Sequence, residues 1–371
     1  MKDPASRVDD ESFMRSALTL AARALGRSAP NPAVGCLIVR DGRVVGRGWT
    51  QPGGRPHAET MALAQAGPAA RGATAYVTLE PCAHHGRTPP CTDALIAAGI
   101  ARVAIPLVDP DPRVSGRGVA MLEAAGIAVT CGCLEAEAAA LNRGFLTRIR
   151  SGRPWLVLKL AQSLDGRIAT AAGESRWITG VEARREVHLA RALADAVLVG
   201  TGTARADDPM LDVRGIGLAQ ANPVRVIVSA DLDLPPAGRA GASARSIPLW
   251  LVHAPDTPAA RREAWEATGA TLIEVPRRAD RRIDLGALLA ALGARGLTRV
   301  LCEGGGGLAA GLIAEGLADE IVTYTAGLVI GGDGTPAVAA TGLARLADAP
   351  RYRLVGTRIL GADLRAEWRR L

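Results

Sequence analysis

Short apolar segments alternate with amphipathic helical patterns along most of this chain, and this alternation restricts the possible folds more than any other feature. In the first 150 residues the strand-like segments are residues 34–39, 44–49, 74–79, 102–107 and 127–130. The helical patterns around them cover residues 9–25, 57–66, 92–98, 118–125 and 135–149. Asp41-Gly42, between the first two strands, is a hairpin signal. We therefore predict an α/β sandwich with a largely parallel sheet beyond the hairpin.

The pattern is interrupted at Arg150-Ser151-Gly152-Arg153-Pro154 and then resumes. The strand-like segments that follow are residues 155–158, 196–199, 224–229, 249–252, 271–275, 299–302 and 321–325, with helical patterns over 182–193 and 261–267. A chain of 371 residues has the usual length of two or three domains. We therefore predict two domains, residues 1–150 and 151–371, both of the α/β class.

Composition narrows the function classes. The net charge of +7 would suit nucleic acid or phosphorylated ligands, but the arginines are spread along the chain and aromatic residues make up only 3%. Bases need aromatic side chains to stack on, so we expect no nucleic-acid partner. Residues 1–11 contain no apolar signal segment, and no window reaches the roughly 18 apolar residues of a membrane span. We expect a cytoplasmic protein without a membrane partner, whose six cysteines are ligands or buried thiols and not disulfides.

The strongest local signal is a set of metal-binding residue types: His57-Ala58-Glu59, then Pro81-Cys82, then Cys91. Zinc favours imidazole nitrogen and thiolate sulfur, and three such ligands leave a fourth position for water, as in catalytic sites. Glu59 lies only two residues from His57. On a helix the two would not share a face, so Glu59 is better suited to moving protons than to binding the metal. Cys91 lies at a predicted helix N-terminus, where the dipole favours thiolate.

One alternative accompanies this hypothesis. The metal site could be purely structural, with His84 or His85 as the fourth ligand, in a zinc-stabilised module that is no enzyme; Glu59 would then have no role. The other cysteines, Cys36, Cys131, Cys133 and Cys302, lie in or beside apolar strands. We expect these four to be inert buried thiols.

The order of these residues matches the His-x-Glu and Pro-Cys signature of zinc-dependent nucleobase deaminases. Eight residues separate the two cysteines here, where the general signature has two, and the segment Glu80–Cys91 resembles the bifunctional riboflavin-biosynthesis deaminase/reductase family. The resemblance implies a cytidine-deaminase-like α/β/α sandwich for the N-terminal domain. The stretch Asn31-Pro32-Ala33-Val34-Gly35 resembles the start of the family's substrate-binding strand, which implies that Asn31 contacts the pyrimidine. Thr50 stands where family members often have His, so that substrate contact is not carried over.

In the second domain the residue patterns alone say less. Gly304–Gly307 follow a strand and precede a helix, as in a phosphate-binding turn or any tight turn, and the Rossmann glycine spacing is not cleanly present. The stretches 159–169, 173–179, 206–209 and 302–305 resemble the reductase half of the same family, which implies a dihydrofolate-reductase-like α/β fold and NADPH. The match runs from about Glu11 to Ala326, and the last forty or so residues add little to it.

The resemblance also assigns residues in this second domain. The implied cofactor contacts are Ala161, Trp177, Thr203, Asp207, Ser229 and Gly305. The implied contacts to the sugar-phosphate substrate are Ser175, Arg191, Leu211, Arg214 and Glu303. Arginine suits a phosphate because its planar fork donates hydrogen bonds in pairs. Lys159 and Asp207 are candidates to assist proton transfer.

The function implied by the resemblance is riboflavin biosynthesis in two steps on one phosphoribosylated pyrimidine. The first is hydrolytic deamination of 2,5-diamino-6-ribosylamino-4(3H)-pyrimidinone 5′-phosphate, with one zinc ion (Zn²⁺) per chain and Glu59 as the catalytic residue. The second is NADPH-dependent reduction of the ribose side chain to ribityl. We expect a homo-oligomer. The rival hypothesis is a nucleic-acid-editing zinc deaminase with a C-terminal binding domain.

Overall fold

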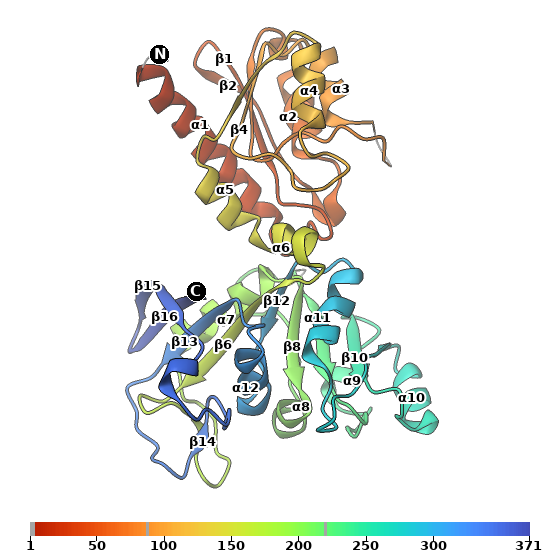
Figure 1. Cartoon of the computed structure of the whole chain (residues 1–371), viewed down its shortest axis with the longest axis vertical. Helices are drawn as coiled ribbons and strands as arrows, with labels where there is room; N and C mark the ends of the chain where they lie inside the picture. The colour runs from red at the N-terminus through yellow and green to blue at the C-terminus, as the bar shows by residue number, and fades with distance from the viewer. Residues whose placement is uncertain (1–3, 87–88, 219–220) are drawn as a thin grey trace. The chain divides into compact units, whose positions relative to one another are not determined.

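The computed structural model describes residues 4–86, 89–218 and 221–371 of the chain. The chain folds into two compact units, Met1–Gly152 and Arg153–Leu371 (Figure 1). The division lies within the segment Arg150–Pro154, where the sequence pattern is interrupted. No helix in the described part of the chain combines the length and the apolar character that a membrane span requires.

The first unit is built around a five-stranded sheet. Its strands are β1 (Gly35–Arg40), β2 (Arg43–Trp49), β3 (Thr74–Val77), β4 (Arg102–Ile105) and β5 (Ala128–Cys131). Its α-helices are α1 (Pro4–Ala21), α2 (Ala58–Ala66), α3 (Cys91–Ala97), α4 (Arg117–Ala124), α5 (Glu135–Leu141) and α6 (Arg143–Ser151). The strand order is β2-β1-β3-β4-β5, antiparallel among β2, β1 and β3 and parallel from β3 to β5. The predicted hairpin is present, since Asp41 and Gly42 both have positive φ.

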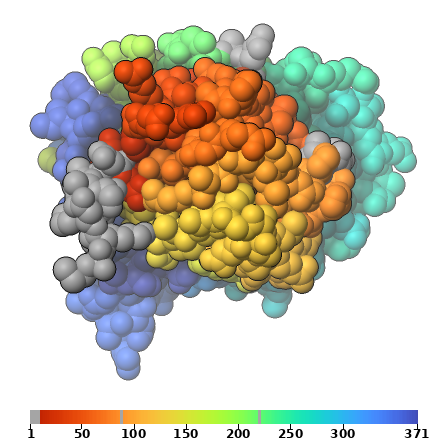
Figure 2. Space-filling model, turned by 90° about the horizontal axis from the view of Figure 1, so that it is seen from above, coloured from red at the N-terminus to blue at the C-terminus, as the bar shows by residue number. Residues whose placement is uncertain are grey.

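Alternate residues of the strands face two different cores. In β1, Cys36 and Ile38 pack with α2, α3 and α4, whereas Leu37 and Val39 pack with α1 and α5. The sheet is therefore covered on both faces, and the predicted α/β/α sandwich is confirmed (Figure 1). In the space-filling view the red, orange and yellow atoms of this unit form one closely packed body (Figure 2).

Helix α2 lies directly on the backbone of β2 because two glycines leave room for it. A Cβ at Gly46 would lie 2.1 Å from the carbonyl oxygen of Ala62, and one at Gly48 would lie 2.0 Å from that of Ala58. No side chain fits at such distances without moving the helix. This close approach fixes the position and orientation of α2 relative to the sheet, and the candidate catalytic residues lie at the start of this helix.

One helix prediction is wrong, because the structure has two helices where one continuous helix is expected. The pattern over residues 135–149 predicts a single helix, but the structure has α5 and α6, interrupted at Asn142. The Asn142 side chain is used in a tertiary contact: its Nδ2 donates to the Ala33 carbonyl at 2.9 Å and its Oδ1 accepts from the Ala33 N–H at 2.9 Å. The break therefore ties this helical pair to the segment that leads into β1.

The cysteine prediction is also partly wrong. Cys36 and Cys302 are buried as expected, but Cys133 is only partly buried and Cys131 is exposed. Cys131 is the last residue of β5, and β5 is an edge strand of the sheet. No neighbouring strand covers that edge, which explains the exposure.

The second unit contains a nine-stranded sheet in the order β11-β10-β9-β8-β12-β6-β13-β16-β15, and a separate two-stranded pair β14-β7. The strands are β6 (Trp155–Gln162), β7 (Arg167–Ala169), β8 (Ala196–Gly200), β9 (Val224–Val228), β10 (Leu249–His253), β11 (Thr271–Glu274), β12 (Arg299–Cys302), β13 (Glu320–Thr325), β14 (Thr335–Pro336), β15 (Tyr352–Leu360) and β16 (Asp363–Arg370). The helices are α7 (Val181–Ala192), α8 (Thr201–Asp207), α9 (Arg239–Ala242), α10 (Ala259–Glu266), α11 (Leu285–Ala294) and α12 (Gly306–Ala314). The pairs from β11 to β13 are parallel, and every strand predicted for this part of the chain is present.

This sheet also has a core on each face. Leu156 and Leu158 of β6 pack in a cluster with α11 and α12, whereas Val157 packs in a second cluster that includes α7 and Trp265 of α10. The second unit is thus also a layered α/β body, as predicted. Its central strands bring their carboxyl ends to the edge where α8 and α12 begin.

The antiparallel hairpin β15–β16 lies at the edge of the sheet, in a part of the chain for which the sequence analysis assigns no element. Arg358 pairs with Arg365 across the hairpin, and both form ion pairs with Glu186 of α7. The next pair, Ile359 and Leu364, points to the opposite side, where Ile359 is 78% exposed. On the hairpin, charged side chains therefore face helix α7 and apolar side chains face outward. This is the reverse of the usual pattern for an antiparallel sheet that is covered on one side.

The buried carboxylate of Glu80 organises the loops at the carboxyl ends of β3 and β4. It accepts hydrogen bonds from the backbone N–H groups of Asp109 (3.0 Å), Gly116 (3.0 Å), Gly118 (2.8 Å) and Val119 (3.2 Å). Three of these donors belong to the start of α4, where a negative charge also meets the positive end of the helix dipole. Glu80 thus stabilises both the loop 109–116 and the helix that follows it.

We predict that Glu80→Gln lowers the free energy of unfolding of the first unit by about 2–3 kcal/mol, because an amide can accept with one oxygen only and leaves buried N–H groups unpaired. Urea unfolding of the full chain, followed through zinc release and circular dichroism, measures the change. Glu123→Gln, at an exposed position of α4, serves as the matched control and should change stability by less than about 0.5 kcal/mol. Equal effects of the two substitutions would contradict the role assigned to Glu80.

Candidate functional site

The three predicted zinc ligands come together in the first unit. His57 Nδ1 lies 3.3 Å from Cys91 Sγ and 3.6 Å from Cys82 Sγ, and the three ligand atoms lie within 4.8 Å of one another. His57 directly precedes α2, Cys82 lies in the loop after β3, and Cys91 is the first residue of α3. In the described part of the chain, these residues form the one His, Cys and carboxylate cluster whose geometry could hold a metal ion.

The chemistry of this donor set fits zinc. Hydrogen bonding from Cys91, opposed by burial and supported by His57, lowers the pKa of the Cys82 thiol to about 4. A hydrogen bond between His57 and Cys82 raises the pKa of His57. A separate hydrogen bond between Cys91 and Cys82, together with burial, raises the pKa of Cys91. One imidazole nitrogen and two sulfurs in a partly buried cluster match the ligand preference of Zn²⁺. Zinc binds thiolate sulfur and neutral imidazole, so a bound cation would displace the protons that the raised pKa values keep on His57 and Cys91.

His84 and His85, considered as an alternative fourth ligand, are not part of the cluster. His84 lines the adjacent cavity, and the His85 ring lies 3.9 Å from the Asp93 carboxylate at the surface. Arg87 and Thr88 of the same motif lie outside the described residues. The geometry therefore favours an open three-ligand site over a closed structural one.

Glu59 lies in the first turn of α2 and is only 4% exposed. Burial, together with the negative charge of Cys82, raises the pKa of its carboxyl to about 7. Such a value suits a group that both takes up and releases protons near neutral pH. The sequence argument placed His57 on the helix, which is wrong, since His57 has an extended backbone and only caps α2. Glu59 is not one of the three residues of the candidate metal-binding cluster.

A cavity of about 310 Å³ opens beside this cluster. Asn31 lines it and donates to the Gly54 carbonyl at 3.2 Å. Thr50 also lines it, but its hydroxyl accepts from the Val34 N–H at 3.0 Å and so serves the backbone. The wall residues that the sequence analysis missed are Arg55, Asp109, Asp111, Arg113 and Arg148. Asp109 and its neighbours follow β4, and polar residues just beyond the carboxyl end of a parallel strand were a usable signal.

In the second unit, all predicted reductase residues except Ser229 line one cavity of about 380 Å³. The predicted residues in its wall are Ala161, Ser175, Trp177, Arg191, Thr203, Asp207, Leu211, Arg214, Glu303 and Gly305. Ser229 is buried at the end of β9, and its N–H donates to the Val252 carbonyl at 2.9 Å. The resemblance therefore named residues from many separate segments that the fold brings to one place.

Glu303 is the charged centre of this cavity. Arg191 grips its carboxylate with two hydrogen bonds, of 2.6 Å and 3.0 Å, and the Lys159 ammonium lies 3.9 Å away. Burial alone would raise the pKa of Glu303, but Arg191 and Lys159 outweigh it and hold this pKa at about 2. Burial lowers the pKa of Lys159, while Glu303 opposes that shift. The site thus holds a carboxylate that is ionised over the whole physiological pH range.

A larger cavity of about 690 Å³ adjoins the first and shares Ile168, Ser175, Thr203, Asp207 and Gly305 with it. Residues 200–203 at the start of α8 and residues 305–308 at the start of α12 form one part of its wall. The Gly305 N–H donates to Thr203 Oγ1 at 2.9 Å, which holds these two helix starts together. The sequence analysis named Ser175, Thr203, Asp207 and the glycine run that includes Gly305–Gly307, but it missed Arg278 and Arg282 in the same wall.

Comparison with known proteins accounts for both units. The family model described as the cytidine and deoxycytidylate deaminase zinc-binding region matches residues 7–107, and the RibD C-terminal domain matches residues 154–365. The riboflavin biosynthesis protein RibD of Escherichia coli K12 is 44% identical over 368 residues, covering 96% of this chain and 98% of that protein. That of Aquifex aeolicus is 41% identical, covering 87% and 88%.

Solved structures agree. Acinetobacter baumannii RibD, form 2, superposes with a TM-score of 0.89 at 37% identity, covering 99% of this chain and 100% of the other. The Thermotoga maritima diaminohydroxyphosphoribosylaminopyrimidine deaminase/5-amino-6-(5-phosphoribosylamino)uracil reductase has a TM-score of 0.85 at 33% identity, covering 99% and 100%. The predicted fold classes of both units, cytidine-deaminase-like and reductase, are confirmed, and the nucleic-acid-editing alternative and the non-enzymatic zinc module are not supported.

These matches define the activity at the level of the family. The chain is an enzyme that acts on pyrimidine substrates, with a zinc-binding deaminase part and a reductase part that implies a nicotinamide cofactor. By sequence, by both family models and by structure, it belongs to the RibD family of bifunctional deaminase/reductases of riboflavin biosynthesis.

Proposed function

We propose that residues 1–150 hydrolyse the 2-amino group of 2,5-diamino-6-ribosylamino-4(3H)-pyrimidinone 5′-phosphate and that residues 151–371 then reduce its ribose side chain to ribityl with NADPH. The observation that carries this proposal is the convergence of His57, Cys82 and Cys91 beside the buried Glu59, at the edge of a 310 Å³ cavity. The T. maritima relative is named for the same pair of activities.

One zinc ion per chain would be held by His57, Cys82 and Cys91. When bound, zinc supplies a nucleophile at neutral pH by lowering the pKa of water to about 7. Glu59 accepts one proton of the attacking water on its carboxylate and delivers it to the departing amino group, while the second water proton ends on the adjacent ring nitrogen, so that ammonia leaves and a ring carbonyl remains. Asn31, in the cavity wall, contacts the pyrimidine and orients it.

NADPH would occupy the 690 Å³ cavity and reach into the smaller one, where it supplies the hydride. Thr203, Asp207 and Gly305 line both cavities and are well placed to contact it. The backbone N–H groups at the start of α12 favour the cofactor's phosphates. Ala161 and Trp177, in the wall of the smaller cavity, are further proposed cofactor contacts. Ser229 lines neither cavity and is only 1% exposed, so its contact rests on the resemblance alone.

The sugar phosphate would bind in the 380 Å³ cavity, against Ser175, Arg191, Leu211, Arg214 and Glu303. Arg214 is 57% exposed and free to turn to a phosphate, although it pairs with Asp212 in this structure. Arg191 is already bound to Glu303 and to the Asp212 carbonyl, so its contribution includes holding the site in shape. Lys159 and Asp207 are the groups that could deliver a proton to the opened sugar as the hydride arrives.

We also propose that the chain forms a homo-oligomer through the outward apolar side of the β15–β16 hairpin. Leu354, Ile359 and Leu364 are each more than 40% exposed there. An exposed apolar side beside an unpaired edge strand is typical of a surface that associates with another chain.

Replacing the proton-transfer group tests the deaminase assignment. We predict that Glu59→Gln keeps one equivalent of zinc, measured by elemental analysis, and lowers the deamination rate at least 10²-fold, because the amide cannot accept the proton. Glu137→Gln, at an exposed position of α5, should leave the rate unchanged. Loss of zinc together with activity would instead make Glu59 part of the metal site.

Removing the metal from the full chain tests the division of labour. We predict that chelation abolishes deamination and leaves NADPH-dependent reduction of the deaminated intermediate unchanged, since every proposed zinc ligand lies before residue 150. Product masses measured with and without NADPH separate the two reactions, and re-added zinc should restore the first. A parallel loss of reduction would refute the assignment of separate sites.

Burying a charge at the hairpin tests the oligomer. We predict that Ile359→Glu converts the oligomer into a monomer in size-exclusion chromatography with light scattering, because a carboxylate cannot be desolvated against an apolar partner surface. Glu266→Gln, at an exposed position of α10, is the control. An unchanged mass for Ile359→Glu, or a monomeric parent chain, would disprove this interface.

A further inference from the structure

The loop 208–214 forms one wall of the 380 Å³ cavity. It follows α8 and contributes Pro209, Met210, Leu211 and Arg214 to the lining. None of these four is among the residues that line the 690 Å³ cavity. The loop therefore faces the cavity that we assign to the sugar-phosphate substrate, and not the one that we assign to most of NADPH.

No regular secondary structure within the loop fixes its conformation. Residues 209–214 belong to no helix or strand. Asp208 and Leu211 have φ values of 39° and 53°, in the left-handed region that side chains with a Cβ disfavour. Contacts from neighbouring elements must hold such a conformation in place.

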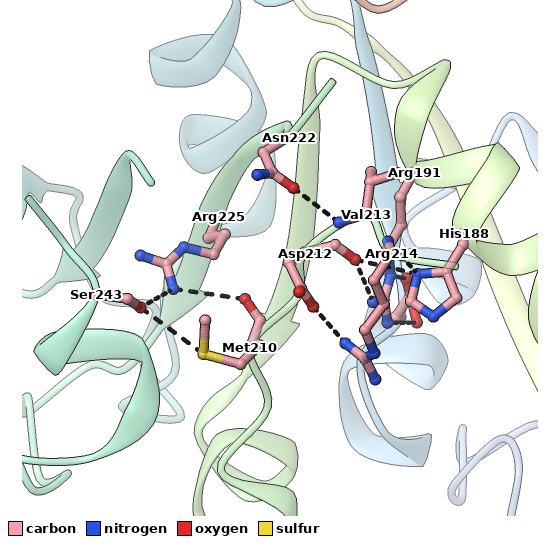
Figure 3. A network of polar contacts seen from close by, with 10 residues as sticks. His188, Arg191, Met210, Asp212, Val213, Arg214, Asn222, Arg225 and Ser243 are labelled. Atoms are coloured by element: carbon pink, nitrogen blue, oxygen red, sulfur yellow. Dashed lines mark hydrogen bonds and ion pairs between the residues drawn. The ribbon is translucent and has the colours of Figure 1, made fainter. Parts of the chain in front are cut away.

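Four side chains from outside the loop contact its backbone, those of His188, Arg191, Asn222 and Arg225 (Figure 3). The His188 Nδ1 atom lies 3.2 Å from the Asp212 carbonyl oxygen and 3.4 Å from the Arg214 backbone nitrogen. Arg225 donates from Nη1 to the Met210 carbonyl at 3.4 Å, and Arg191 donates to the Asp212 carbonyl at 2.9 Å. Asn222 accepts from the Val213 N–H at 2.8 Å. The Leu211 side chain, between these anchors, is buried in the core of the unit. The backbone groups of Met210, Asp212 and Val213 are thus held by side chains from separate segments of the unit.

Arg225 is an unusual residue for its position, the second residue of the buried strand β9. Its side chain is fully buried, and no described residue forms an ion pair with it. Burial lowers the pKa of its guanidinium to about 10. It donates to the Ile247 carbonyl at 2.6 Å and to Ser243 Oγ at 2.7 Å, besides Met210. A buried cation without a carboxylate partner is costly, so an apolar side chain would serve better if filling space were its only task.

The contacts of Arg225 require a guanidinium. Its planar fork reaches Met210 on one side and Ile247 on the other at the same time, which the single nitrogen of a lysine cannot do. Ser243 strengthens the link, since its hydroxyl also contacts the Met210 sulfur at 3.8 Å. Arg225 thus connects the start of the loop to the segment that follows α9.

We propose that Arg225 and Asn222 are positioning residues of the reductase site: they hold the backbone of the loop 209–214, whose Leu211 side chain is buried in the core, so that the loop forms a fixed wall of the sugar-phosphate cavity from which Arg214 can reach the substrate. This inference rests on the proposed function of that cavity. Neither residue needs to touch the substrate, because both act through the loop backbone. The cofactor site and the deaminase site do not depend on them.

The test uses the full-length zinc-loaded protein with Arg225→Lys and, separately, Asn222→Leu, which removes the Val213 acceptor at similar volume. We expect each to raise the KM for the deaminated intermediate about tenfold, with kcat within roughly threefold of the parent, because a displaced wall weakens substrate binding. The Kd for NADPH, from fluorescence titration, and the deamination rate should stay within about twofold. Hydrogen–deuterium exchange should rise in residues 208–214 and stay unchanged in α11.

Leu292→Ala is the matched control, since Leu292 is fully buried in α11 and lines neither cavity. It should lower the melting temperature without changing the KM. A KM unchanged in both variants overturns the proposal, and so does a KM that rises equally in Leu292→Ala or a Kd for NADPH that rises in parallel. If Arg225→Lys does not fold, Asn222→Leu decides alone. A parent enzyme that cannot reduce the intermediate would refute the proposed function, while exchange in the loop would still decide whether the anchors position it.

Discussion

A carboxylate buried just beyond the end of a parallel strand needs a full set of hydrogen-bond donors, and both units of this protein are arranged to provide one. Glu80 lies three residues after β3 and takes its donors from the backbone of the loop and helix that follow β4. Glu303 directly follows β12, accepts two hydrogen bonds from Arg191 of α7 and lies 3.9 Å from the Lys159 ammonium of β6. An unpaired carboxylate at either place would cost several kcal/mol, so the segments that bear its partners have little freedom. Residues of those segments line the cavities, so a requirement of folding also shapes each site.

The deaminase site depends on a second constraint, the contact of helix α2 with the backbone of β2 at Gly46 and Gly48. The contact fixes the end of the helix where His57 and Glu59 stand two residues apart. An extended residue followed by a helical one directs the imidazole to the metal cluster and the carboxylate beside it. The change from extended backbone at His57 to helical backbone at Ala58 thus directs the proposed metal ligand, His57, and the proposed proton-transfer group, Glu59, to different positions.

Local pattern was sufficient for part of this protein. Strand and helix alternation, the hairpin at Asp41-Gly42 and the residue types at His57, Cys82 and Cys91 are all written within short stretches of sequence, and each was predicted before the fold was known. The helix break at Asn142 was missed because its cause, the contact with Ala33, comes from a residue 109 positions away. The β15–β16 hairpin was missed because its apolar residues face outward, so that its pattern does not read as part of a core.

The sequence by itself determined the α/β class of both units and, through resemblance, the family, because these are recorded as periodicity and motifs. Only the tertiary structure decided that nearly all reductase residues named by resemblance share one cavity wall, that Arg191 is committed to Glu303, and that Arg225 and Asn222 contact the loop in that wall. Arg225 looks like any other strand residue in the sequence. Its meaning lies in the directions of its donors once the side chain is buried, and direction in space is the information that a linear pattern lacks.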